Sequence, residues 1–182
     1  MAKRLEKSEI RERVTKKMGE NVQGPGAGYS VSSAVSEPLK RKLRGRWMIC
    51  EHRVGTEEYL TRFVSRALRG MELEGGEYTA EYEFREGICL KRVEIRATIA
   101  GEEAGSEYYY RLRVASAWDL EGAGFLSIRP ELGYQCTELG GEPAAVKDLD
   151  EPPEPVIVAF RFEGDSLVLE EGEDYKRLER IT

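Results

Sequence analysis

Alternation of apolar and polar side chains is the feature that most limits what this chain can fold into. From Glu77 onward, apolar residues recur at every second position in several short runs, and the clearest run spans 78–84. Successive side chains of a strand point to opposite faces of a sheet, so this period of two predicts half-buried β-strands. We expect a first strand at 47–50 and later ones at 78–84, 88–99, 108–114, 125–129, 134–138, 156–162, 167–170 and 175–181. The fold class is therefore mainly β, with eight or nine antiparallel strands.

Short strands at close spacing, each with one polar face, are typical of a β-barrel or a β-sandwich. A single up-and-down barrel is favoured, because closure removes the exposed edges of a sheet. The run 88–99 changes parity, since Ile88 and Leu90 are out of phase with Val93. A β-bulge near Lys91-Arg92 is expected to restore the phase and help the sheet curl.

One helix is expected between the first two strands. Thr56 is a suitable N-cap and Gly70 a suitable stop. The apolar residues between them form one broad face, made of Tyr59, Leu60, Phe63, Val64, Ala67 and Leu68. Such a face is suited to covering an opening or an apolar surface of the barrel.

A Gly-x-Trp motif, Gly45-Arg46-Trp47, opens the first strand, and the last strand carries Arg177 and Arg180. This combination resembles the calycin superfamily, which includes the lipocalins and the fatty-acid-binding proteins. The resemblance implies that Trp47 plugs the closed end of a barrel and that a late basic residue lies across its ring. Arg177 and Arg180 are both candidates, because they lie on opposite faces of the strand. It also implies that the barrel holds a small apolar molecule.

A helix-grip fold, an α+β architecture in which a curved sheet wraps a long helix, is the alternative. That fold generally ends in its long helix, whereas this chain is predicted to end in a strand. The lipocalin-like barrel with one covering helix is therefore the first choice.

Charge divides the chain into two parts. Residues 1–46 hold 12 Lys and Arg against 5 Glu, whereas residues 47–182 hold 16 against 29 Asp and Glu. We expect a basic N-terminal segment at 1–37, with a short helix and a Gly/Ser-rich flexible linker, followed by the barrel domain at 38–182. A basic arm on an acidic body suits an acidic protein partner. Nucleic acid is disfavoured, because glutamates interrupt the basic residues and no aromatic lies among them for base stacking.

Composition also predicts the setting of the protein. No run approaches the roughly 18 apolar residues of a membrane span, and the first residues lack the apolar core of a signal peptide. The 3 cysteines cannot all pair within the chain, which suits a reducing compartment, so a cytoplasmic location is expected. Abundant Glu and a single Asn are typical of a thermophile.

No arrangement for catalysis stands out, so we predict no catalytic residue, no cofactor and no metal site. His52 is the single histidine, and the chain lacks a G-x-S-x-G motif. Cys50 and His52 are two residues apart and are expected to share a face of the first strand. With Cys89 and Cys136 they could form a Cys₃His zinc site, but the close C-x-x-C pairs typical of such sites are missing.

Aromatic residues on the apolar face are the candidate ligand-binding residues: Tyr78, Tyr82, Phe84, Tyr110 and Phe162. An apolar cavity with a few inward hydroxyl groups is typical of a small-molecule pocket. The leading hypothesis is non-catalytic binding of a small apolar or amphipathic ligand inside the barrel. The alternative is a filled barrel scaffold that acts as a protein–protein interaction module through the basic arm. An enzyme ranks third.

Overall fold

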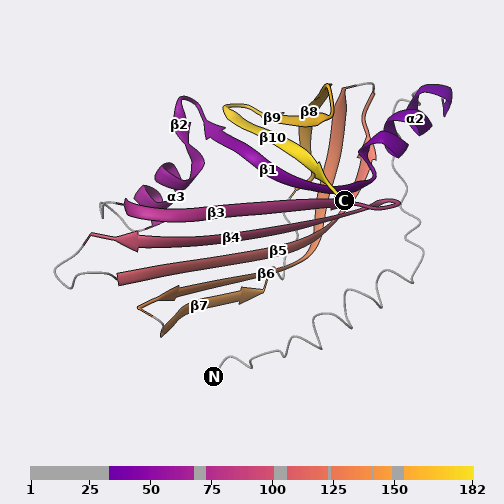
Figure 1. Ribbon diagram of the computed structural model, residues 1–182. Helices are drawn as coiled ribbons and strands as arrows, with labels where there is room; N and C mark the ends of the chain where they lie inside the picture. Colours follow the sequence, from indigo (N-terminus) through magenta and orange to yellow (C-terminus); the bar gives the residue numbers. More distant parts are fainter. Residues whose placement is uncertain (1–32, 68–72, 101–105, 123, 141, 149–153) are drawn as a thin grey trace.

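The computed structural model describes residues 33–67, 73–100, 106–122, 124–140, 142–148 and 154–182 (Figure 1). The expected helix at 3–19 and the linker after it lie outside these ranges. Within them the elements are α2 (Ser33–Leu43), β1 (Gly45–Val54), β2 (Glu57–Glu58), α3 (Tyr59–Ala67), β3 (Leu73–Phe84), β4 (Ile88–Ile99), β5 (Ser106–Leu120), β6 (Phe125–Leu139), β7 (Glu142–Asp148), β8 (Val156–Glu163), β9 (Ser166–Glu171) and β10 (Asp174–Ile181).

Eight of the ten strands in the described part of the chain close into an antiparallel barrel. Their order is β10-β9-β8-β6-β5-β4-β3-β1, and β10 pairs with β1 from Arg46↔Ile181 to Val54↔Asp174. The prediction of a mainly β, closed antiparallel barrel is confirmed. The helix-grip alternative is wrong, because the sheet closes on itself and the last element is a strand.

Strand β6 serves two partners along its length. Its first residues, 125–128, pair with β8, whereas residues 134–139 pair with β7. Between them the register against β5 shifts, at the point where Pro130 lies. A proline cannot donate to a ladder and belongs at such an irregularity. The two separate strands expected at 125–129 and 134–138 are therefore two pairing segments of one long strand.

Two clusters of buried side chains lie in the interior. The closed-end core lies toward α2 and comprises Leu43, Trp47, Tyr82, Phe84, Cys89, Trp118, Leu126, Val158, Phe160, Leu167, Leu169 and Leu178. The open-end core lies beneath α3 and comprises Val64, Ala80, Val93, Ile95, Ala97, Ile99, Tyr108 and Tyr110. The helices lie at opposite ends of the barrel (Figure 1). Each large side chain buried in this way contributes about 1.5–3 kcal/mol of hydrophobic stabilisation.

Helix α3 begins later than its sequence suggests. Thr56 is not its cap, because Glu57 and Glu58 form the short strand β2 by pairing with β1. The helix starts at Tyr59, and its expected stop at Gly70 lies outside the described residues. Within α3, Val64 is fully buried against the open-end core.

Strand β4 has no bulge near Lys91-Arg92, so that prediction is wrong. Residues 88–99 pair with β5, and residues 89–98 with β3, with no shift of register in these stretches. Lys91 consequently stays in phase with Cys89 and Val93, both of which are buried. The side chain of Lys91 therefore faces the interior, and Ile88 and Leu90 face outward.

A bulge occurs in β1 instead. The register of β1 against β10 shifts between Ile49 and Glu51, which leaves Cys50 as the extra residue. Trp47 faces inward before the bulge and His52 faces inward after it, although their spacing is odd. The prediction that Cys50 and His52 share a face is wrong, since Cys50 is exposed and His52 is buried.

The closed end is held by contacts between Trp47, α2 and the last strand. Trp47 is 1% exposed, and its Nε1 donates to the carbonyl oxygen of Leu43 at 2.7 Å. The guanidinium of Arg180 lies 4.3 Å from the Trp47 ring. The same guanidinium donates to the carbonyl oxygens of Lys42 at 2.5 Å and Arg44 at 2.8 Å. Arg180 thus fixes the end of α2, a helix that crosses the domain boundary expected at 37/38.

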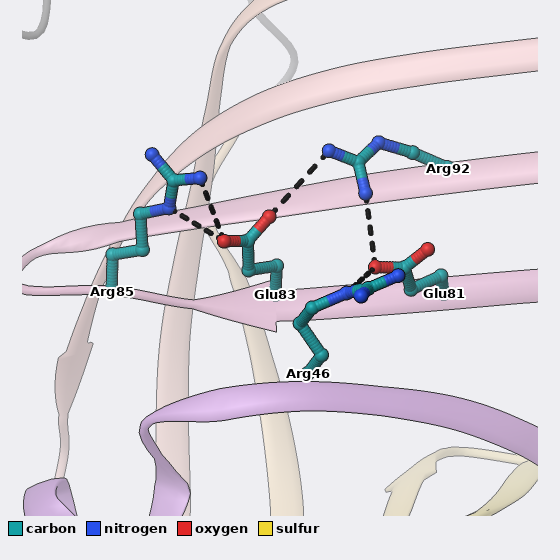
Figure 2. Close-up of polar contacts among 5 residues, drawn as sticks. All are labelled: Arg46, Glu81, Glu83, Arg85 and Arg92. Carbon is teal, nitrogen blue, oxygen red and sulfur yellow. Dashed lines mark hydrogen bonds and ion pairs between the residues drawn. The ribbon is translucent and has the colours of Figure 1, made fainter. Parts of the chain in front are cut away.

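An ion network covers the outer face of β1, β3 and β4 near this end (Figure 2). Glu81 accepts from Arg46 at 2.7 Å and from Arg92 at 2.9 Å. Glu83 pairs with Arg85 at 2.7 Å and with Arg92 at 3.5 Å. The hydrogen bond from Arg46 is the main reason that the pKa of Glu81 lies below its usual value. The network ties three neighbouring strands together from outside.

Candidate functional site

A chain of hydrogen bonds links β1, β3 and β10 beside the open-end core. Nδ1 of His52 lies 2.6 Å from the hydroxyl of Tyr78, and its Nε2 lies 2.7 Å from Oδ1 of Asp174. The other carboxylate oxygen of Asp174 accepts from Nζ of Lys176. The pairing of β1 with β10 brings these residues together, because His52 is directly opposite Lys176. We call Tyr78, His52, Asp174 and Lys176 the interior relay.

The charges of the interior relay follow from burial. Burial disfavours the imidazolium and lowers the pKa of His52, an effect that the hydrogen bond with Asp174 only partly offsets. Burial also acts to raise the pKa of Asp174, but hydrogen bonds from His52 and Lys176 outweigh it and hold that pKa below its usual value. At neutral pH the relay thus contains a neutral imidazole, which donates from Nε2 and accepts at Nδ1, beside an ionised carboxylate.

Tyr59 links the interior relay to helix α3. Its ring stacks on His52 with centroids 3.9 Å apart and planes 7° apart. The ring of Tyr78 lies 4.9 Å from the same tyrosine. Because Tyr59 is the first residue of α3, the start of this helix is positioned by the relay.

Lys91 is a second interior lysine, and its surroundings differ from those of Lys176. Its neighbours across the sheet are Tyr82 on β3 and Val114 on β5, and its Nζ lies 5.6 Å from the centre of the Tyr82 ring. Among the described residues, no side chain forms a hydrogen bond or ion pair with the amine of Lys91. Burial lowers the pKa of Lys91, and the charge of Asp174 offsets part of this effect.

A pocket of about 540 Å³ lies between α3 and the inner face of β5 and β6. Phe63 forms its helical side, with its ring 4.8 Å from that of Tyr110 and 6.4 Å from that of Tyr108. The full lining is Phe63, Ala67, Tyr108, Tyr110, Gln135, Thr137 and Leu139. The walls are thus mainly aromatic and aliphatic, with one amide and one threonine hydroxyl, as in many small-molecule sites.

The structure separates the aromatic residues that the sequence suggested as one pocket lining. Tyr110 lines the pocket, and Tyr78 belongs to the interior relay. Tyr82 and Phe84 lie in the closed-end core, and the ring of Phe162 packs 6.2 Å from that of Trp47. These rings share a face of the sheet, but they lie at different depths along the barrel.

Several site residues escaped the sequence reasoning. Gln135 and Thr137 lie on a strand segment with a weak pattern, although their parity with Leu139 was a usable signal. Lys91 was missed because the bulge expected beside it would have turned its side chain outward. Phe63 was assigned to a covering helix, and it does face the barrel interior.

The cysteines do not gather into a site. Cys50 is exposed, whereas Cys89 and Cys136 are buried free thiols, and burial raises the pKa of Cys89 to about 12. In the described ranges, no three or more His, Cys, Asp or Glu side chains are grouped so as to hold a metal ion. The helices in those ranges are too short or too polar to cross a membrane.

No family model, curated protein or solved structure matches this chain significantly.

Proposed function

We propose that this chain is a calycin-like barrel that binds a small amphipathic molecule between α3 and the inner face of β5 and β6. The 540 Å³ pocket carries the proposal. Its volume falls within the range of about 300–1,000 Å³ that small-molecule sites occupy. Phe63 and Tyr110 supply apolar contact area, and Thr137 and Gln135 supply polar groups.

Polar side chains in the interior favour an amphipathic ligand over a pure hydrocarbon. Lys91 and Lys176 lie near the ionised carboxylate of Asp174, beside a neutral His52. A ligand that reaches from the pocket toward the relay thus meets groups able to contact a polar end. The stacking of Arg180 on Trp47 supports the calycin resemblance, and a cytoplasmic location stays a prediction.

The test is the uptake of an apolar fluorophore, 1-anilinonaphthalene-8-sulfonate, by the folded protein. Replacing Tyr110 by Ala removes an aromatic wall of the pocket, and we expect a loss of about 1–2 kcal/mol, or roughly five- to thirtyfold in Kd. Tyr109 is the matched control, since it is the next residue on β5 and lies on the opposite face, with its ring 5.0 Å from the guanidinium of Arg111. Tyr109→Ala should leave uptake unchanged.

A second variant fills the pocket instead of enlarging it. Ala67→Phe places a ring in the space beside Phe63, so uptake should fall although every native contact remains. Equal uptake by Ala67→Phe, Tyr110→Ala and the unmodified protein would refute binding at this pocket.

The alternative function is a filled scaffold that acts on an acidic protein through the basic residues 1–46. The closed-end core favours it, because aromatic and aliphatic side chains occupy that half of the barrel. A chain without residues 1–32 keeps α2 and tests this alternative. It should lose salt-sensitive retention on immobilised polyglutamate if the arm is the docking element, while fluorophore uptake by the barrel persists.

A further inference from the structure

We propose that Lys91 captures an amphipathic aldehyde as an imine. Lys91 lies deeper in the barrel than the pocket, and this inference rests on the proposed function. Three observations carry this inference: the amine faces the interior, it has no hydrogen-bonded ion-pair partner among the described side chains, and the interior relay lies nearby, with the charge of Asp174 acting on the amine.

The contrast between the two interior lysines defines the site. Nζ of Lys176 donates to Asp174, which also accepts from His52. Both carboxylate oxygens of Asp174 thus have partners other than Lys91, and the Lys91 amine lies over the face of the Tyr82 ring, 5.6 Å from its centre. Burial of an amine that has no hydrogen-bonded counter-ion favours its neutral form, which is the nucleophilic one.

The chemistry is a reversible condensation without redox change. The nitrogen lone pair of Lys91 attacks the carbonyl carbon to form a carbinolamine. The carbonyl oxygen then leaves as water with the two amine protons, and a carbon–nitrogen double bond forms. Neutral His52 and the hydroxyl of Tyr78 belong to the adjacent relay, which can hold a proton during dehydration.

The register of the sheet sets the size of the aldehyde. Lys91 lies opposite Val114, and Tyr110 of the pocket is four residues further along β5. At a rise of about 3.4 Å per residue, the amine and the pocket wall are separated by roughly 13 Å. The apolar chain would therefore lie along Val93 and Leu112, which occupy the intervening rows. An extended alkyl aldehyde of medium length, such as decanal, has about the length of this separation.

The experiment treats the full-length protein with decanal and sodium cyanoborohydride at about neutral pH and maps the modified lysines by mass spectrometry. We expect one decyl group on Lys91, added faster than on exposed lysines, because the lowered pKa of this amine raises its neutral, nucleophilic fraction. Lys176 is the matched internal control and should stay unmodified. Lys91→Arg and Lys91→Met should both abolish the fast label.

Labelling spread evenly over exposed lysines, or undiminished in either Lys91 variant, would overturn the inference. Displacement of the fluorophore by decanol reports non-covalent uptake separately. Uptake without labelling of Lys91 refutes imine capture and leaves the proposed function standing, whereas the absence of both refutes both. Decanoate binding that depends on Lys91, with no imine from decanal, would also overturn the inference, because the site would then be one for anions.

Discussion

Replacing Arg180 by Ala removes three contacts at the closed end of the barrel, and each contact contributes to the free energy of unfolding. The guanidinium donates to the carbonyl oxygens of Lys42 and Arg44, and it lies 4.3 Å from the ring of Trp47. Because Arg180 is exposed, each hydrogen bond is taken at the lower end of its range, about 0.5–1 kcal/mol. The cation–π contact adds about 0.5–1 kcal/mol. We expect the free energy of unfolding to fall by about 2 kcal/mol.

Arg177 is the matched control, since it is a basic residue of the same strand. Its guanidinium contacts Oγ of Ser166 at 3.4 Å, a long and weak hydrogen bond. Arg177→Ala should therefore cost less than about 0.5 kcal/mol. Arg180→Lys keeps the charge but not the planar fork, so it should cost about half as much as Arg180→Ala.

Urea unfolding followed by tryptophan fluorescence measures these differences, and for a domain of this size about 2 kcal/mol lowers Tm by roughly 4–8 °C. A double-mutant cycle of Arg180→Ala with Trp47→Phe isolates the ring contact, for which we expect a coupling of about 0.5–1 kcal/mol. If Arg177→Ala and Arg180→Ala lowered the free energy of unfolding equally, the contacts of Arg180 with α2 and Trp47 would not determine stability at this end.

Three further predictions concern pH and packing. The pKa of Glu81 is lower in the folded than in the unfolded state, so its stabilisation is present above about pH 4.5 and is lost as pH falls through the folded pKa. In urea titrations Glu81→Gln should cost about 1 kcal/mol at pH 7 and little near pH 3, while Glu86→Gln, at a side chain that is 91% exposed, changes nothing. The folded pKa of His52 is likewise lowered, so the unfolded state binds the proton first and stability falls as pH drops below about 6.5. His52→Gln should flatten that part of the curve, and an unchanged slope would refute the assignment. A Cβ at Gly76 would lie 2.5 Å from a backbone oxygen of β4, whereas one at Gly75 meets nothing within 4 Å. Gly76→Ala should therefore cost about 1–3 kcal/mol in calorimetry, and Gly75→Ala much less.

The sequence pattern identified the strands because burial of one sheet face imposes a period of two, but it misplaced the bulges. Ile88 and Leu90 are apolar residues on the outer face, so the sequence pattern indicated a bulge that the strand does not have. Around Cys50 the opposite occurs. Met48 and Ile49 are consecutive apolar residues, so the pattern gave no sign of the bulge that follows them. A one-residue shift reverses every side chain beyond it, so each error moved an interior lysine or histidine to the other face.

The interior relay could not be predicted, because its members lie far apart in the chain. His52 is 26 residues from Tyr78 and 122 from Asp174, and the pairing of β1 with both β3 and β10 unites them. The same register decides the closed end, where Trp47 lies opposite Arg180 and not Arg177. Tyr110 could be placed on the inner face by parity, whereas its depth along the barrel required the completed topology.

The division of β6 between two partners has a consequence for how the proposed ligand would enter and leave. The hydrogen bonds of residues 134–139 to β7 are separate from those of residues 125–128 to β8, which help to close the barrel. The edge beside the pocket can therefore fray while the closed ring of strands stays intact. Entry and departure of a guest molecule would then proceed through local opening, at rates independent of how strongly the rest of the protein resists denaturation.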